Sequence, residues 1–547
     1  MAKADILARD PKAVSHLRRQ LPRGRLGLIF GSGASRELGF PNWAELVDGI
    51  AKNKHVDGES IVARFVEKGP GGNPITRSLA SITQILFNEF RQNALTRKNL
   101  QPPLTFLEEQ SLKTEWLQIV HGELYKAVDH KARSEKITSH AYLTAFREII
   151  KRSPLTVNYN FDDTLEKMLL DSRVGDEITS TRGYEVTDKP DAQFQNNNGV
   201  IYHPNGYLPS IFQDGSSADV VFSDDSFQDQ LTSAASGKHL NLSQHLFRNT
   251  CLLIGLSLED VTLQNLLRQN AVSNPGNVHY IVHFREAGKQ DAETEEIIFR
   301  ANFSSYNLYT LFLDSTGIRD LAELIHMSEP SFALNHRPDK IKFVYYLIGS
   351  IGSGKSTAAS KFRSLITYDE WIDERRPELA VHESTLPADQ VNDINPWIAE
   401  QFRKKNFALS AYKEGIHLVD RSPLDPLTFG TAAERGEKAR SLIEKITDND
   451  SRNIEPGHII FLDCDLADVK VRSSLKHKYW SDQQFLELLQ ALAEVYGNVD
   501  RSVVCTRGRT ATQVAHEISK IIFLEKYCPV DVRAELTKHT SQANAAA

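Results

Sequence analysis

Apolar residues fall along the chain in two patterns that alternate with each other. Short apolar runs between glycine, proline or polar residues are typical of buried strands, and longer stretches with an apolar residue every three or four positions are typical of helices. In the first part of the chain, these runs predict strands over 26–30, 155–157, 200–202, 220–222, 251–254, 279–283 and 308–313. Helical periodicity marks 4–20, most of 42–150 and 260–269. Strands that alternate with helices favour a parallel, doubly wound sheet.

The same alternation begins again after a polar, proline-containing segment at 335–340, where we expect a domain border. The second part predicts strands over 341–348, 416–419 and 458–463, and helices over 355–366, 483–496 and 511–525. The predicted fold class is therefore α/β, with two doubly wound parallel-sheet domains. We expect the first domain over 1–335 with a helical insert over 45–150, the second over 336–530, and a loose polar tail over 531–547.

Composition narrows the class of protein. Of the 547 residues, 64 are Lys or Arg and 71 are Asp or Glu, so the net charge is −7, and 40% are hydrophobic. This balance argues against wholesale disorder and against bulk binding to nucleic acid. No apolar run of membrane-spanning length and no apolar leader occurs, and the four cysteines form no CxxC pair. We therefore expect a cytoplasmic protein without a zinc ribbon, a disulfide framework or a membrane anchor.

A phosphate-binding motif opens the second domain. The segment 349–357 fits G-x-x-x-x-G-K-[ST] and stands between a predicted strand and a predicted helix, which is the context that the motif requires. Its backbone N–H groups would surround phosphate, Lys355 would reach the β- and γ-phosphates of ATP, and the Ser356 hydroxyl would bind Mg²⁺. A degenerate site that binds a nucleotide without hydrolysing it is the alternative. The residues assigned to the nucleotide are Gly349, Gly352, Ser353, Gly354, Lys355, Ser356, Thr357, Asp420 and Arg421.

Asp420 and Arg421 follow the predicted strand 416–419, at the sheet edge where ligands of doubly wound folds bind. An exposed salt pair between the two is the alternative reading. Together with the phosphate loop, the Asp-Arg-Ser element resembles the nucleoside and nucleotide kinases, and the deoxynucleoside and thymidylate kinases in particular, over about residues 341–527. This resemblance implies phosphoryl transfer from ATP to a nucleoside or nucleoside monophosphate, with Asp420 in the acidic role and Arg421 on phosphate. A basic segment at 471–478 would provide Arg472 or Lys476 to a lid, or else is a solvated helix face.

Four elements of the first domain follow predicted strands in a fixed order. They are a glycine-rich turn at 30–35, Asn-Tyr-Asn-Phe-Asp-Asp at 158–163, His-Pro-Asn-Gly at 203–206, and Gly-Leu-Ser at 255–257. Together they resemble the sirtuin superfamily, in the divergent branch found in bacterial anti-phage proteins, over roughly residues 24–315. The resemblance implies a Rossmann-type domain that binds NAD. The helical region takes the place of the small domain, and the zinc ribbon is missing, which argues for cleavage of NAD rather than deacylation of proteins.

The resemblance also implies roles for single residues. Gly31, Ser32, Gly33, Ala34 and Ser35 would line the diphosphate and ribose, and Gly255 and Ser257 would contact the adenosine side. Asn160 would hold the nicotinamide ribose or the attacking water, and Asp162 the carboxamide; an Asx turn that caps the next helix is the alternative for both.

One position departs from the family pattern. Asn205 stands where the family has its catalytic histidine, just before glycine, and the nearest histidine is His203. Strand alternation would place residues 203 and 205 on the same side. Three alternatives are open: His203 is the base, catalysis proceeds without a base, or the domain binds NAD without cleaving it.

The resulting prediction is an anti-phage defence effector. Its first domain hydrolyses NAD to nicotinamide and ADP-ribose, and its second domain binds a nucleotide and gates the hydrolase, by oligomerisation and in response to a phage-derived trigger. The first alternative is a nucleoside or nucleotide kinase with a catalytically inactive, NAD-sensing sirtuin-like domain. The second is a scaffold in which both sites hold ligands and a partner acts.

Overall fold

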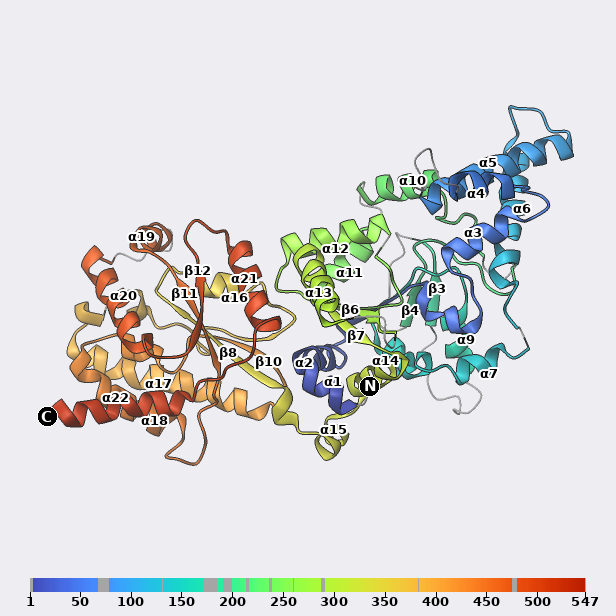
Figure 1. Cartoon of the computed structure of the whole chain (residues 1–547). Helices are drawn as coiled ribbons and strands as arrows, with labels where there is room; N and C mark the ends of the chain where they lie inside the picture. The colour runs from blue at the N-terminus through green and yellow to red at the C-terminus, as the bar shows by residue number, and fades with distance from the viewer. Residues whose placement is uncertain are drawn as a thin grey trace. The chain divides into compact units, whose positions relative to one another are not determined.

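The computed structural model describes residues 3–66, 78–129, 131–171, 184–189, 199–212, 216–235, 239–258, 260–286, 291–381, 383–474 and 480–546. The chain divides into two compact units (Figure 1). The first contains most of the chain up to His326, and the second contains the rest. Two short segments, Leu7–Arg19 and Ala271–Val278, belong to the second unit although they precede its main part in sequence.

The first unit is built on a parallel sheet of seven strands in the order β3-β4-β2-β1-β5-β6-β7. Its strands are β1 Leu26–Phe30, β2 Thr156–Asn158, β3 Tyr184–Thr187, β4 Gly199–Tyr202, β5 Thr250–Ile254, β6 His279–Phe284 and β7 Leu308–Leu313. Every residue of β1 and β5 is buried, as expected for parallel strands that are covered on both faces.

Helices cover both faces of this sheet. On one face, α11 (Leu240–Arg248) and α12 (Val261–Ser273) pack their leucines against the core side chains of β1, β2 and β5. On the other face, Phe30 meets Phe146 of the η3 turn with ring centroids 5.8 Å apart. The helices of the first unit beyond residue 20 are α3 Trp43–Ala51, α4 Glu59–Val66, α5 Leu79–Lys98, α6 Phe106–Tyr125, α7 Arg133–Thr138, α8 Arg147–Arg152, α9 Thr164–Asp171, α10 Asp224–Ala235, α11 Leu240–Arg248, α12 Val261–Ser273, α13 Ala292–Tyr306 and α14 Ser315–His326, with 3₁₀ turns η1 Ser32–Ala34, η2 Arg36–Leu38 and η3 Leu143–Phe146.

The strand order of the first unit reverses between β1 and β5. From β1 the chain moves outward through β2 to the edge strand β3, places β4 between these two, and then returns to place β5 on the other side of β1. Phe30 pairs with Ile254, so the two strands end level with each other. The turns that follow them therefore meet at a topological switch point, which is where doubly wound sheets bind ligands.

The second unit has a parallel sheet of five strands in the order β12-β11-β8-β10-β9. Its strands are β8 Lys342–Gly349, β9 Ile366–Tyr368, β10 Gly415–Asp420, β11 His458–Asp463 and β12 Arg501–Cys505. One face packs against the apolar sides of α17, α18, α20 and α22. The helices of this unit include α2 Pro11–Gln20, α15 Glu329–Asn335, α16 Lys355–Ala359, α17 Ala388–Ala411, α18 Arg435–Ile446, α19 Leu466–Ser474, α20 Asp482–Tyr496, α21 Ala511–Phe523 and α22 Val532–Ala546. None of the helices formed by the described residues combines the length and apolar character needed to span a bilayer.

Helix α2 is bound to the second unit by buried polar contacts. The Ser15 hydroxyl donates to the carbonyl of Ile341 at 2.6 Å, and the Arg18 guanidinium pairs with Glu414 at 3.1 Å. Ala13, Val14 and Leu17 are fully buried beside these contacts. A start of the second domain at residue 336 would therefore leave out a helix that completes it.

The α/β class with two parallel sheets is confirmed, and several element boundaries differ from prediction. The segment 220–222 is not a strand, and the edge strands β3, β9 and β12 were missed. The helix predicted over 4–20 is two helices, α1 Lys3–Arg9 and α2, because Pro11 begins a new helix and lacks the N–H that would continue the old one. Helix α16 ends at Ala359 rather than at 366. The predicted loose tail is helix α22, which buries Val532 and Leu536 completely.

Candidate functional site

Two glycine turns form the floor of a pocket at the switch point of the first sheet. A Cβ on Gly31 would lie 2.5 Å from the Gly255 carbonyl oxygen, and a Cβ on Gly255 would lie 2.6 Å from the Ala34 nitrogen. Gly255 also has φ +70°, a conformation that favours glycine. Gly33 donates its N–H to the Gly255 carbonyl at 3.0 Å. The absence of side chains lets the backbones of the two turns touch, and this leaves open space above them.

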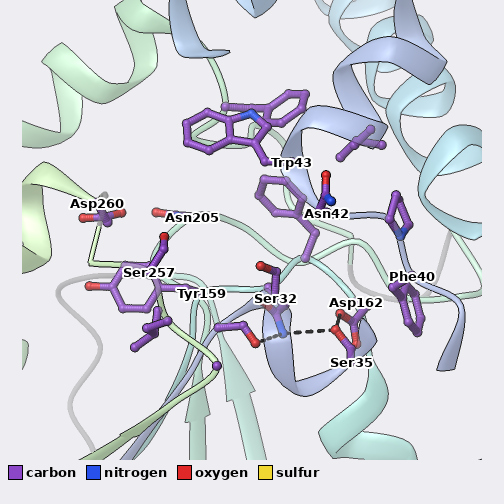
Figure 2. Close-up of a pocket in the computed structure, with 18 of the residues that line it drawn as sticks. Ser32, Ser35, Phe40, Asn42, Trp43, Tyr159, Asp162, Asn205, Ser257 and Asp260 are labelled. Atoms are coloured by element: carbon purple, nitrogen blue, oxygen red, sulfur yellow. Dashed lines mark hydrogen bonds between the residues drawn. The ribbon is translucent and has the colours of Figure 1, made fainter. Parts of the chain in front are cut away.

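The structure brings most of the predicted residues to this pocket (Figure 2). The predicted residues that line it are Gly31, Ser32, Ser35, Asn160, Asp162, Asn205, Gly255 and Ser257. Gly33, Ala34 and His203 do not line it. Gly33 and Ala34 belong to the supporting contact between the turns, as the hydrogen bond and the Cβ distance above indicate.

Asn160, Ser35 and Asp162 form a hydrogen-bonded cluster at one end of the pocket. The Asn160 amide donates to the Gly31 carbonyl at 3.0 Å and to the Ser35 hydroxyl at 3.3 Å. Ser35 in turn donates to Asp162 Oδ2 at 3.0 Å (Figure 2). Burial raises the pKa of the Asp162 carboxyl above its ordinary value. The cluster thus presents amide, hydroxyl and carboxyl oxygens of fixed orientation to whatever lies in the pocket.

The predicted Asx turn is also present at this cluster. Asn158 Oδ1 accepts the N–H of Asn160 at 3.1 Å, and Asp162 Oδ1 accepts the N–H of Thr164, the first residue of α9, at 3.0 Å. The local turn and the pocket contacts therefore coexist. Asn158 and Thr164 orient the backbone, and that backbone aims Asn160 and Asp162 at the pocket.

His203 is a buried, hydrogen-bonded residue of the turn that follows β4. Strand β4 ends at Tyr202, and residues 203–206 form a turn in which Gly206 donates to the His203 carbonyl at 3.2 Å, so strand alternation does not extend to them. The His203 ring is fully buried, with Nδ1 2.8 Å from the Asn160 carbonyl and Nε2 2.9 Å from Glu166 Oε1. Burial disfavours the charged imidazolium, but the neighbouring Glu166 carboxylate favours it more strongly, so the pKa of His203 is raised. Both ring nitrogens are engaged, so the position of the ring does not suit a base that takes a proton from the pocket.

A buried ion pair behind the pocket ties the helical insert to the Asn160 loop. Arg133 of α7 pairs with Asp163 at 2.6 Å, and Tyr125 of α6 donates its hydroxyl to the same carboxylate at 3.0 Å. Burial opposes ionisation of Asp163, but Arg133 and the hydrogen bonds from Ser210 hold its pKa below the ordinary value. The sequence gives no local signal for this pair, because its members lie 30 residues apart in different elements.

Aromatic side chains form a second wall that sequence reasoning did not assign. Trp43 opens α3, and its ring centroid lies 6.0 Å from that of Phe222 and 5.7 Å from that of Phe227. Phe161 meets Phe222 edge to face at 5.7 Å. All four line the pocket. Rings of this kind offer a planar, apolar surface to a planar ligand. The run Gly-Phe-Pro-Asn-Trp at 39–43 was the available signal for this wall.

In the second unit, the predicted phosphate loop has the backbone that its motif requires. Gly349, Gly352 and Gly354 have φ of +143°, +82° and +95°. A Cβ on Gly349 would lie 2.6 Å from the Leu462 carbonyl oxygen of β11. Lys355 extends over the loop, and its ammonium donates to the carbonyls of Gly349 and Ser350 at 2.9 Å each.

Polar atoms at this loop fit a phosphate and a hard cation. The side-chain oxygens of Ser350 and Ser353 are buried and have no partner among the described residues, and the same holds for Asp420 Oδ1. The other Asp420 oxygen accepts the hydroxyl of Ser356 at 2.7 Å. A hydroxyl and a carboxylate side by side are the oxygen ligands that Mg²⁺ prefers. The contact between Ser356 and Asp420 is therefore compatible in its chemistry with the predicted role of Ser356 as a ligand of Mg²⁺.

Arg421 is buried and does not form an exposed salt pair with Asp420. Its guanidinium pairs with Glu370 at 2.7 Å and with Asp425 at 3.3 Å. Its backbone has φ +73°, which is unusual for a residue with a side chain and is typical of functional sites. Arg421, Glu370 and Asp425 line a second pocket together with Trp371 and Phe429. Of these five residues, Arg421 had been assigned a role from the sequence.

Two lysines and an arginine complete this part of the second unit. Lys405 of α17 is buried and donates to the carbonyls of Glu370 and Asp420, and burial lowers its pKa to about 8. Burial also lowers the pKa of Lys355. Arg472, a candidate lid residue, donates to the carbonyl of Thr506 at 3.0 Å. Lys476, the other candidate, lies outside the described residues.

Three comparisons with known proteins bear on these sites. Residues 154–311 match the family model of the SIR2-like domain. This range includes Asn160, Asp162, His203, Asn205 and the turn at 255–257, and it excludes the turn at 31–35. Two structures of deoxyadenosine kinase from M. mycoides are similar at 12% and 13% identity. The first, with dCMP and dCDP bound, aligns over 37% of this chain and 100% of the kinase with a TM-score of 0.24, and the second, with dATP bound, over 33% and 98% with a TM-score of 0.25. No curated protein matches the chain at the significance required.

Proposed function

We propose that the first unit hydrolyses NAD to nicotinamide and ADP-ribose, that the second unit binds a nucleotide and gates this activity, and that the whole protein acts in anti-phage defence. One observation carries the proposal. Asn160, Ser35 and Asp162 converge on a pocket at the switch point of a parallel sheet, within and beside the region that matches the SIR2-like domain. The defence role rests on the resemblance described above.

The pocket offers the groups that cleavage of an N-glycosidic bond needs. The turns at Gly31 and Gly255 let a diphosphate approach the backbone closely. Asn160 would orient the nicotinamide ribose or the water, and Asp162 would hydrogen-bond the carboxamide. The transition state resembles an oxocarbenium ion, and dipoles fixed in advance stabilise such charge. The Trp43, Phe222 and Phe227 rings would cover a planar base.

In the second unit, the phosphate loop would bind the phosphates of ATP or a related nucleotide. The unpartnered oxygens of Ser350 and Ser353 would face the ligand, and Lys355 would exchange its two carbonyl acceptors for phosphate oxygens. Ser356 and Asp420 would hold Mg²⁺, which supplies charge neutralisation when bound. Gating follows from the chemistry of the first unit, since an NAD hydrolase without control would deplete its own cell.

A second candidate function is a nucleoside or nucleotide kinase whose first unit senses NAD without cleaving it. The pocket of Arg421, Glu370 and Asp425 favours this candidate. Arg421 directly follows the end of β10, and its buried guanidinium forms ion pairs with the carboxylates of Glu370 and Asp425. Asn205 in place of histidine favours it as well.

Product analysis separates the two candidates. The full-length protein is incubated with NAD, with and without ATP and Mg²⁺, and the products are separated by chromatography. We expect equal amounts of nicotinamide and ADP-ribose. Transfer of phosphate from ATP to a deoxynucleoside without any loss of NAD would support the kinase and contradict the hydrolase.

Gating is tested in the full chain rather than with an isolated first domain, because a cut near residue 336 separates α2 from the second unit that it completes. We expect Lys355→Ala to change the dependence of NAD loss on added nucleotide. An identical dependence in the variant and the wild type would contradict gating through the phosphate loop.

A further inference from the structure

Asp260 is a carboxylate in the NAD pocket that neither the sequence nor the proposed roles assign. It lies five residues after Gly255 and directly before α12, where its Oδ1 accepts the N–H of Leu263 at 2.7 Å and caps the helix. Its Oδ2 is buried and has no partner among the described residues. Asp260 lines the same pocket as Asp162 (Figure 2). One oxygen thus has a structural role, and the other is a buried acceptor that no described group satisfies.

Asn205 lies next to this carboxylate and is held in one orientation (Figure 2). Gln230 donates from its amide nitrogen to Asn205 Oδ1 at 3.1 Å, and Thr262 donates its hydroxyl to Gln230 Oε1 at 2.9 Å. Since the oxygen of Asn205 accepts from Gln230, its NH₂ group faces Asp260. Asn205 therefore cannot replace the missing histidine as a base, but it can orient a carboxylate that does.

The electrostatic surroundings of Asp260 suit a proton acceptor. Burial raises the pKa of Asp260, while the N–H groups of Leu263 and Thr262 and the amide of Asn205 act in the opposite direction. Tyr159, which directly follows β2, is a titratable group that interacts with Asp260, and burial and Asp260 hold its own pKa well above its ordinary value. A carboxylate of increased basicity in a mostly apolar pocket is the form in which Asp or Glu acts as a general base.

The other candidate bases, Asp162 in the pocket and His203 outside it, are already engaged. Both oxygens of Asp162 accept hydrogen bonds, from Ser35 and from Thr164. Both ring nitrogens of His203 are bonded as well. Of the described carboxylates that line the pocket, Asp260 is thus the one with an oxygen that no described group bonds.

We propose that Asp260 is the general base for the water that attacks NAD, a role that rests on the proposed hydrolase function. The bond between C1′ of the ribose and the nicotinamide nitrogen breaks, and its electron pair leaves with neutral nicotinamide. The water oxygen forms the new bond to C1′, and its proton passes to Asp260 Oδ2 and from there to solvent. Asn205 is a positioning residue that keeps the carboxylate aligned.

The test is Asp260→Asn in the full-length protein, assayed for NAD loss and NAD binding. Asparagine caps helices as well as aspartate does, so the contact with Leu263 persists and folding is preserved. A general base contributes roughly 10²- to 10⁴-fold, so we expect kcat to fall at least about 100-fold, while KM and the Kd for NAD stay within about twofold. The acidic limb of the wild-type profile of kcat/KM against pH should disappear in the variant.

Asp291→Asn is the matched control. Asp291 caps α13 through the N–H of Thr294 in the same unit and lies outside the pocket. We expect this variant to keep the wild-type kcat and pH profile. If Asp260→Asn does not fold, Asp260→Ser supplies another capping side chain without a carboxylate and carries the same expectation.

Three results would overturn the inference. Wild-type kcat with an unchanged acidic limb in Asp260→Asn would show that another group takes the proton. A weakened Kd with unchanged kcat would make Asp260 a binding residue. Wild-type protein that binds NAD and never cleaves it, with any added nucleotide, would refute the proposed function itself and remove the need for a base.

Discussion

Replacing Asn160 by alanine distinguishes an effect on NAD cleavage from an effect on protein stability, because the side chain of Asn160 makes few contacts. The side chain makes two hydrogen bonds, to the Gly31 carbonyl and to the Ser35 hydroxyl. Neither partner is left alone in the variant: the Gly31 carbonyl still accepts the Ala34 N–H at 3.0 Å, and Ser35 still donates to Asp162. The cost is therefore that of two ordinary hydrogen bonds, about 1 kcal/mol each, without a buried group that has lost its only partner.

A loss of about 2 kcal/mol lowers the melting temperature by only a few degrees in a unit of this size. The catalytic effect is expected to be much larger. Removing one oriented dipole from a site that stabilises developing charge costs roughly 10²- to 10³-fold in kcat. We therefore expect Asn160→Ala to retain its circular dichroism spectrum and most of its melting temperature, and to lose NAD cleavage nearly completely.

The assay measures nicotinamide release under the conditions in which the wild type is active, with melting curves of the same samples. Asn302→Ala is the matched control, since Asn302 donates to the Thr310 hydroxyl at 3.0 Å in the same unit and lies outside the pocket. We expect the control to lose stability to a similar extent and to keep its activity. Undiminished turnover by Asn160→Ala would mean that the reaction takes place elsewhere.

Three further predictions concern the phosphate loop, the buried histidine and the glycine turns. Lys355→Ala should weaken ATP binding roughly 10- to 100-fold, because it removes charge-assisted hydrogen bonds worth about 1.5–3 kcal/mol, and an unchanged Kd by titration calorimetry would remove the site. The raised pKa of His203 means that its pair with Glu166 stabilises the fold fully below the ordinary histidine value near 6.5, and that this contribution is lost as the pH rises through the higher folded value. Urea midpoints between pH 6 and 9 should therefore fall in the wild type, and Glu166→Gln should flatten that slope; parallel slopes would contradict the pairing. Gly255→Ala should abolish NAD binding and lower the melting temperature, because φ +70° costs a side chain about 1–2 kcal/mol and its Cβ would lie 2.6 Å from a backbone nitrogen; wild-type affinity would show that the contact between the turns is not needed.

The apolar runs predicted the central strands because those strands are buried on both faces. Strand β12 was missed because only Val504 among its residues is buried, and the run 501–505 therefore lacks the apolar pattern of a central strand. The run 220–222 was mistaken for a strand for the opposite reason. Val220 and Phe222 are buried, but Phe222 packs against Trp43 and Phe161 rather than in a sheet, and local hydrophobicity cannot distinguish the two.

The residues of the candidate site were predictable where they follow strands. Asn160 and Asp162 come directly after β2, and the end of a parallel strand leads to the ligand edge. Asp260 was not assigned a role from the sequence, because an aspartate directly before a helix is typical of a helix cap. The structure shows that only one of its two oxygens caps the helix. His203 and Asn205 could not be separated by sequence, because the turn that begins after Tyr202 decides where each side chain points.

The membership of helix α2 in the second unit had no sequence signal at all. Its contacts with Ile341 and Glu414 join residues more than 300 positions apart. Such pairings follow from tertiary packing and not from periodicity, and they determine which truncated chains can fold.

The measurement that tests the central claim most directly is NAD loss by the purified full-length protein, alone and with a panel of nucleotides and deoxynucleotides plus Mg²⁺. The account predicts little loss by the protein alone and rapid formation of nicotinamide and ADP-ribose when one nucleotide of the panel is added. NAD that stays intact under every addition, while the protein binds both NAD and ATP, would contradict it.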